Sequence, residues 1–160
     1  MDFTQASTQF LESSATVTQA QPISIASVQF RGAVSGNIIT NGNGASSGVR
    51  LRTTSGGMEL TAGANASSSI APNGSWHAFQ AIANSTSSAV CSDGTETTGL
   101  NAGTLSPSSD TITIGKNLTV FSYDGSMAEA GLWPLAFTTG GGGQVGLINS
   151  NQHGTDGYNF

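Results

Sequence analysis

The chain has 160 residues, a formal net charge of −5 and only 8% charged residues, so its length fits one domain. Its four basic residues (Arg31, Arg50, Arg52 and Lys116) form no run and cannot supply the basic surface that nucleic acids or anionic membranes require. We therefore expect neither nucleic acid nor a membrane as partner. Residues 1–10 lack the basic and apolar regions of a Sec signal peptide, so we expect synthesis in a host cytoplasm.

The composition favours strands and turns over helices. There are 22 Gly, 23 Ser and 19 Thr residues, and all three types are poor helix formers. Cys91 is the single cysteine, so neither an intramolecular disulfide nor a closed cysteine zinc site is available. Its apolar neighbours indicate a small buried residue and not a nucleophile.

Short β-rich runs recur along the chain, separated by turns rich in Gly, Asn and Ser. The predicted strands are Gln9–Glu12, Ile23–Arg31, Asn37–Thr40, Gly48–Thr53, Met58–Thr61, Ser75–Ala83, Ala89–Ser92, Thr111–Gly115 and Ser126–Trp133. Alternation within Ser75–Ala83 places Phe79 and Ala81 on one face and Gln80 and Ile82 on the other. Asp93-Gly94 predicts a tight hairpin leading into a short run at Thr95–Thr98.

The C-terminal part is ambiguous. The run Gly140–Gly143 disfavours a helix by about 1 kcal/mol per residue relative to Ala, but a short helix starting near Gln144 fits the sequence. We expect one domain over residues 1–160. Whether the Gly-rich segment and tail (136–160) fold alone or become ordered against a partner stays open.

Several motifs occur in a recognisable order. They are Gln9–Glu12, the strand led by Pro22, Gly74-Ser75-Trp76-His77-Ala78-Phe79, Ser92-Asp93-Gly94, Thr111–Gly115 and Tyr123–Trp133. The series resembles stand-alone laminin-G-like domains, of phage or bacterial type, in the concanavalin A-like lectin/glucanase superfamily. The resemblance implies an all-β jelly-roll sandwich of two antiparallel sheets, one of them often concave, with at most one short C-terminal helix. The predicted core residues are Trp76, Phe79, Met127, Ala130, Leu132 and Trp133.

The sequence does not favour an enzyme. His77 and His153 are the only histidines, and we interpret His77 as structural and His153 as solvated or packed in the tail. No Ser-His-Asp arrangement can be argued from the spacing, and the paired carboxylates of glucan hydrolases are missing. We interpret Glu129 as a structural residue that bonds locally.

Calcium is the one candidate cofactor, and otherwise we expect none. The weak candidate ligands are Asp93, Asp110 and Asp124, which lie next to predicted turns (Asp2 is a fourth loop-adjacent acid). No regular calcium loop is present, and acidic residues in turns commonly make local hydrogen bonds.

Two functions from different classes remain. The first is a non-enzymatic structural protein of a bacteriophage or phage-like particle, such as a capsid decoration protein or a tail or fibre component. It would form homo-oligomers, for example trimers, contact other virion proteins and reside in the virion. The alternative is an extracellular lectin-like module that binds a surface polysaccharide through Phe121, Tyr123, Asp124 and Tyr158, because exposed rings beside polar groups suit sugars. The two can coexist, and packing of the same rings within the body or between subunits is the simpler interpretation of those residues.

Overall fold

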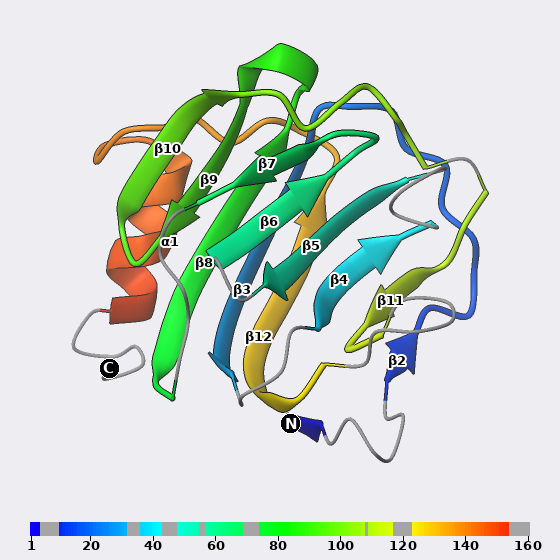
Figure 1. Ribbon diagram of the computed structural model, residues 1–160, viewed down its shortest axis with the longest axis horizontal. Coiled ribbons are helices and arrows are strands. Elements are labelled where there is room, and N and C mark those ends of the chain that lie inside the picture. The colour runs from blue at the N-terminus through cyan, green and yellow to red at the C-terminus, as the bar shows by residue number, and fades with distance from the viewer. Residues whose placement is uncertain are drawn as a thin grey trace.

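The computed structural model describes residues 1–3, 10–31, 36–42, 48–54, 57–68, 74–107, 109–116 and 123–153. These residues form two antiparallel sheets that face each other (Figure 1). No helix in the described part of the chain has the length and apolarity that a membrane crossing needs.

Each sheet has six strands among the described residues. Sheet A has the order β1 (Asp2–Phe3), β12 (Gly125–Trp133), β3 (Ile23–Arg31), β8 (Trp76–Ala83), β9 (Ser88–Ser92) and β10 (Thr95–Leu100). Sheet B has the order β2 (Leu11–Glu12), β11 (Ile112–Ile114), β4 (Asn37–Asn41), β5 (Val49–Thr54), β6 (Gly57–Thr61) and β7 (Asn65–Ser67). A 3-10 turn (Ser85–Ser87) joins β8 to β9, and α1 (Gln144–His153) contacts β8. Sheet B lies in front in Figure 1, and α1 lies behind sheet A.

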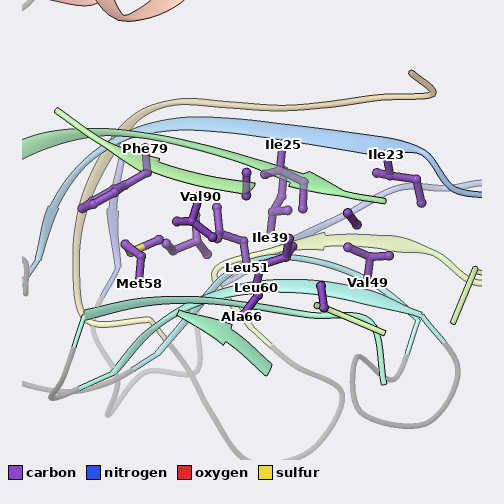
Figure 2. Packing of buried hydrophobic residues seen from close by; sticks show 14 of the residues in the cluster. Ile23, Ile25, Ile39, Val49, Leu51, Met58, Leu60, Ala66, Phe79 and Val90 are labelled. Atoms are coloured by element: carbon purple, nitrogen blue, oxygen red, sulfur yellow. The ribbon is translucent and has the colours of Figure 1, made fainter. Parts of the chain in front are cut away.

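The hydrophobic core fills the space between the sheets (Figure 2). Ile25, Phe79 and Val90 point inward from sheet A and meet Leu51 and Leu60 from sheet B, all nearly inaccessible to solvent. Burial of each such side chain contributes about 1.5–3 kcal/mol, so this interface supplies most of the driving force for the sandwich.

A second, smaller apolar cluster lies on the opposite face of sheet A. Ala26, Ile82 and Cys91 from the sheet pack there with Phe137 and with Val145 of α1. The predicted face assignment of Ser75–Ala83 is confirmed, because Phe79 and Ala81 face sheet B while Ile82 faces α1. Sheet A is therefore buried on both faces wherever α1 covers it.

All nine predicted strands are confirmed, and boundaries within the described residues differ by at most one residue. The predicted start of the first strand, Gln9, lies outside the described residues. The Asp93-Gly94 hairpin is also confirmed: both residues have positive φ (48° and 79°), and Ser92 pairs with Thr95. The short edge strands β1 and β7 were not predicted.

The predicted core is correct at Phe79 and Met127 and wrong at Trp133. Trp133 is 38% exposed because it points away from sheet B, whereas its neighbour Leu132 packs against the inner core. Trp76 is half-buried and packs on Phe30, with ring centroids 6.0 Å apart.

The helix near Gln144 is confirmed, and the preceding glycines allow the close backbone contacts at its N-terminus. Gln144 N–H donates to Thr138 Oγ1 (2.9 Å), and Thr138 N–H donates to Gln144 Oε1 (3.1 Å), which caps the first turn reciprocally. A Cβ atom on Gly143 would lie 2.4 Å from the Thr138 carbonyl oxygen, so the close approach of these two segments requires glycine. Gly140 N–H donates to both carboxylate oxygens of Glu96 (2.8 and 2.9 Å), which ties the turn to β10.

Candidate functional site

A groove of about 720 Å³ opens between β12 and α1 on the outer face of sheet A. Its walls combine apolar, amide and carboxylate groups. The residues that line it are Ala26, Ala128, Glu129, Ala130, Gly131, Trp133, Leu147, Ile148, Asn151 and Gln152.

A β-bulge directs the groove's carboxylate outward. The register of β12 against β3 shifts between Met127 and Glu129, so that Met127 pairs with Gln29 and Glu129 pairs with Val28. Met127 belongs to the core between the sheets, and regular alternation would turn Glu129 to that same face. The extra residue reverses the alternation, and Glu129 joins Gly131 and Trp133 along the groove.

Trp133 forms the aromatic wall of the groove. Its ring lies over Gly131, where a Cβ atom would come within 2.4 Å of the indole, and its centroid lies 5.1 Å from that of Phe137. Ser24 fixes the segment that follows, because its hydroxyl donates to the Leu135 carbonyl (2.7 Å) and accepts from Phe137 N–H (2.9 Å). The ring is thus held on the sheet with part of its surface open to solvent.

A chain of side-chain hydrogen bonds links the groove to the interior. Gln152 is 3% exposed, and its Nε2 donates to Glu129 Oε2 (3.0 Å). Its Oε1 accepts from Gln80 Nε2 (3.0 Å), and Gln80 is fully buried. These contacts join α1 to β12 and β8, and the Gln152 amide binds one oxygen of the exposed Glu129 carboxylate. The predicted local bonding of Glu129 is wrong, because the partner of its carboxylate, Gln152, lies 23 residues away on α1.

This combination of groups suits a polyhydroxylated ligand. A partly exposed indole offers an apolar face, a fixed carboxylate accepts hydrogen bonds, and the Asn151 amide both donates and accepts. Small-molecule sites share this pattern of a mainly apolar concavity with a few oriented polar groups.

A second polar cluster lies on the outer face of sheet B. The Arg52 guanidinium pairs with Glu59 at 2.5 Å, and Arg50 Nη2 donates to Thr61 Oγ1 at 3.4 Å. Burial lowers the pKa of the Arg50 guanidinium, the charge of Arg52 acts in the same direction, and Glu59 opposes both. Because these groups mainly bond to one another across β5 and β6, we assign them to the sheet and place the candidate site in the groove.

The predicted glycan residues do not come together. Tyr123 is fully buried among the inner core residues, and its hydroxyl donates to the Phe30 carbonyl (2.8 Å). The simpler interpretation, packing of this ring within the body, is confirmed, and its candidacy as an exposed ring for a sugar is wrong. Asp124, the next residue, is half-buried just before β12. Phe121 and Tyr158 lie outside the described residues.

The weak calcium candidates likewise form no common site. Within the described ranges, no three His, Cys, Asp or Glu side chains lie close enough together to hold a metal ion. Both carboxylate oxygens of Asp93 bond to β8, one to His77 (2.6 Å) and one to Ala78 N–H (2.8 Å). Asp110 instead forms an isolated bridge with Val17.

Sequence reasoning missed the groove for identifiable reasons. Trp133 was predicted to be a core residue and Glu129 a structural one. Strand alternation does not reveal the bulge that turns both side chains to the outer face. Gln152 carried no local signal, since its role depends on where α1 docks. The unusual pairing of an interior glycine with a tryptophan two residues later, at Gly131 and Trp133, was the one available sign.

No known protein-family profile matches the chain, and no curated protein sequence matches it. Solved structures do match. A heptameric SAP-like pentraxin from Limulus polyphemus shares 14% identity with a TM-score of 0.61, covering 92% of this chain and 76% of the pentraxin. A second match is domain 4 of AbnA, a GH43 extracellular arabinanase from Geobacillus stearothermophilus, solved in complex with arabinotriose. It shares 12% identity with a TM-score of 0.60, and the match covers 81% of this chain and 68% of the AbnA domain.

A third structure, of botulinum neurotoxin type C, shares 11% identity with a TM-score of 0.57. The match covers 83% of this chain but only 36% of the toxin chain, and cell entry of that toxin depends on interaction with two ganglioside molecules. At these identities the likeness shows the fold alone. The chain therefore has the all-β jelly-roll fold that pentraxins share with carbohydrate-binding, lectin-like domains, as the resemblance implied.

Proposed function

We propose that the protein is a carbohydrate-binding domain and that a saccharide binds in the groove between β12 and α1. The observation that carries the proposal is the placement of the Trp133 ring, 38% exposed, beside the oriented Glu129 carboxylate in one concavity. The ring would stack on the apolar face of a sugar, while Glu129 and Asn151 would bond to its hydroxyl groups.

Structures of similar fold support this assignment. One was solved with arabinotriose, and another belongs to a toxin whose cell entry depends on gangliosides. Shared fold does not fix function, so the groove's own chemistry carries the proposal and the similar structures support it.

The test is binding of the purified chain to an array of immobilised neutral and sialylated oligosaccharides. We expect Trp133→Ala to lose at least tenfold in affinity for the glycan that the wild type selects. Leu135→Ala is the matched control, since Leu135 is also exposed (40%) and lies two residues away but does not line the groove. Equal binding by wild type and Trp133→Ala would remove the groove from consideration.

Where the protein acts is a separate proposal. We propose that the protein is a component of a bacteriophage or phage-like particle, in which it forms homo-oligomers. There it would attach the particle to surface polysaccharide; the alternative location is extracellular. The low content of charged residues supports this, because tight packing between copies disfavours buried charge. Density-gradient sedimentation of native lysate, with mass spectrometry of each fraction, tests it: co-migration with large particles at a fixed copy ratio supports the proposal, and free protein contradicts it.

A further inference from the structure

Three side chains form a hydrogen-bonded chain where β8 begins and β9 ends. Ser75 Oγ lies 3.0 Å from His77 Nε2, and His77 Nδ1 lies 2.6 Å from Asp93 Oδ2. Ser75 is exposed, whereas the side chains of His77 and Asp93 are 14% and 27% exposed. The order of the contacts, hydroxyl to imidazole to carboxylate, is that of a nucleophilic triad.

The carboxylate is fixed by its surroundings. Asp93 is the first of the two central residues of the tight β9–β10 turn and has a φ of 48°. Its main-chain N–H donates to the Ala78 carbonyl (2.9 Å). Its Oδ1 accepts from Ala78 N–H (2.8 Å), which leaves Oδ2 directed at the imidazole. The side chain of Asp93 is therefore held by the pairing of β8 with β9.

The hydrogen bonds also assign the imidazole protons. An ionised carboxylate only accepts, so Nδ1 of His77 carries the proton that it donates to Asp93. In the neutral ring Nε2 is then an acceptor, and the Ser75 hydroxyl donates to it. The ring is oriented so that its basic nitrogen faces the exposed hydroxyl, which is the arrangement that activates a serine.

We propose that Ser75, His77 and Asp93 form a hydrolytic triad that acts on carboxylic esters with small acyl groups. Ser75 Oγ bonds to the ester carbonyl carbon while its proton passes to His77 Nε2. That proton then leaves with the departing alcohol as the C–O bond breaks. Water, deprotonated by His77, cleaves the acyl-Ser75 ester and releases the carboxylic acid, which restores the hydroxyl and the neutral ring.

The position of Ser75 sets the substrate class. Ser75 is exposed and does not line the groove between β12 and α1. A substrate therefore reaches its hydroxyl from solvent, and a small acyl group is the kind that needs no deep pocket to hold it. The proposal does not rest on carbohydrate binding, and either activity can fail without the other.

The test is covalent labelling of the full chain with an alkyl fluorophosphonate. Reaction forms the Oγ–P bond and releases fluoride, while the serine proton passes to His77. We expect one adduct by intact mass, mapped to Ser75 by peptide mass spectrometry. Labelling should be lost in Ser75→Ala and slowed at least tenfold in His77→Gln and Asp93→Asn. Ser87→Ala is the matched control, because Ser87 is exposed on the 3-10 turn and outside the triad.

A second readout separates the proposal from a purely structural role. Ser75→Ala removes one exposed oxygen and should leave the melting temperature within 2 °C of wild type while abolishing hydrolysis of p-nitrophenyl acetate above the level of free histidine. Adduct formation at Ser75 that is unchanged in His77→Gln, or no adduct at Ser75 in the wild type, would overturn the proposal. The two side-chain contacts of His77 would then serve only to hold the hairpin.

Discussion

The indole of Trp133 rests directly on Gly131, so closely that a Cβ atom on Gly131 would lie 2.4 Å from the ring. Both residues are on the outer face of β12, two positions apart, and the missing side chain provides the space in which the ring lies. The glycine thus shapes the aromatic wall of the groove.

Replacing this glycine should displace the ring. In Gly131→Ala the new methyl group occupies the place of the indole, which swings toward solvent and loses its contact with Phe137. We expect at least a tenfold loss of glycan affinity with a change in unfolding free energy below about 1 kcal/mol, because an exposed ring can move at low cost. Calorimetric titration and thermal melting of the same variant measure both. Full affinity in Gly131→Ala would show that the ring's position is irrelevant to binding.

The negative charge of Glu129 should contribute to glycan affinity separately from the Trp133 ring. Glu129→Gln keeps an oxygen that can accept from Gln152 but removes the negative charge. Hydrogen bonds to charged groups are worth about 1.5–3 kcal/mol, so we expect roughly tenfold weaker binding. Glu12→Gln is the matched control on β2 in sheet B, where the carboxylate accepts from Thr111 (2.6 Å). Equal losses in both variants would indicate a general effect of net charge instead of a contact in the groove.

Gln152 should matter for the attachment of α1. Gln152→Ala removes its bonds to Glu129 and Gln80 and leaves the buried Gln80 amide without that acceptor. Stranding a buried polar group costs about 1–3 kcal/mol, so we expect this loss in unfolding free energy and faster amide exchange throughout α1. Asn151→Ala, an exposed neighbour on the same helix, should leave the exchange of α1 unchanged. Unaltered exchange in Gln152→Ala would mean that apolar packing alone holds the helix.

Cys91 should make stability depend on alkaline pH. Burial raises the pKa of its thiol from 9.0 to about 11, with Glu96 and Asp93 acting in the same direction and a backbone hydrogen bond from Gly94 opposing them. Because the folded state favours the neutral thiol, this contribution to stability is fully present below pH 9 and is lost as pH rises through 11. Chemical denaturation of wild type and Cys91→Ala between pH 8 and 11 measures it. The wild type should lose more stability over this range, and parallel curves would contradict the assignment.

Strand positions could be predicted from the sequence because they depend on local alternation and turn chemistry. Ile23–Arg31 and the Asp93-Gly94 hairpin are such cases, and both are confirmed. The face that a residue occupies was harder to predict. Trp133 was predicted to be buried and is exposed, and Tyr123, a candidate for an exposed sugar-binding ring, is buried, since exposure depends on which sheet face another element covers.

The candidate site depends on relationships that no local pattern shows. The bulge that turns Glu129 outward is visible only from its pairing with β3, and Gln152 reaches the groove only because α1 docks on sheet A. The contact of His77 with Asp93 likewise requires the register of β8 on β9, although the hairpin at Asp93-Gly94 and its following strand had been predicted.

The most direct test of the central claim is tryptophan fluorescence during titration with the oligosaccharide that the array selects. Trp76→Phe leaves Trp133 as the single reporter, and Trp133→Phe leaves Trp76. A saccharide in the groove covers the exposed indole, so Trp76→Phe should show a saturable shift of its emission to shorter wavelength. Trp133→Phe should show none at the same ligand concentrations. Saturable binding by calorimetry with no change in Trp133 emission would place the saccharide elsewhere and contradict the account.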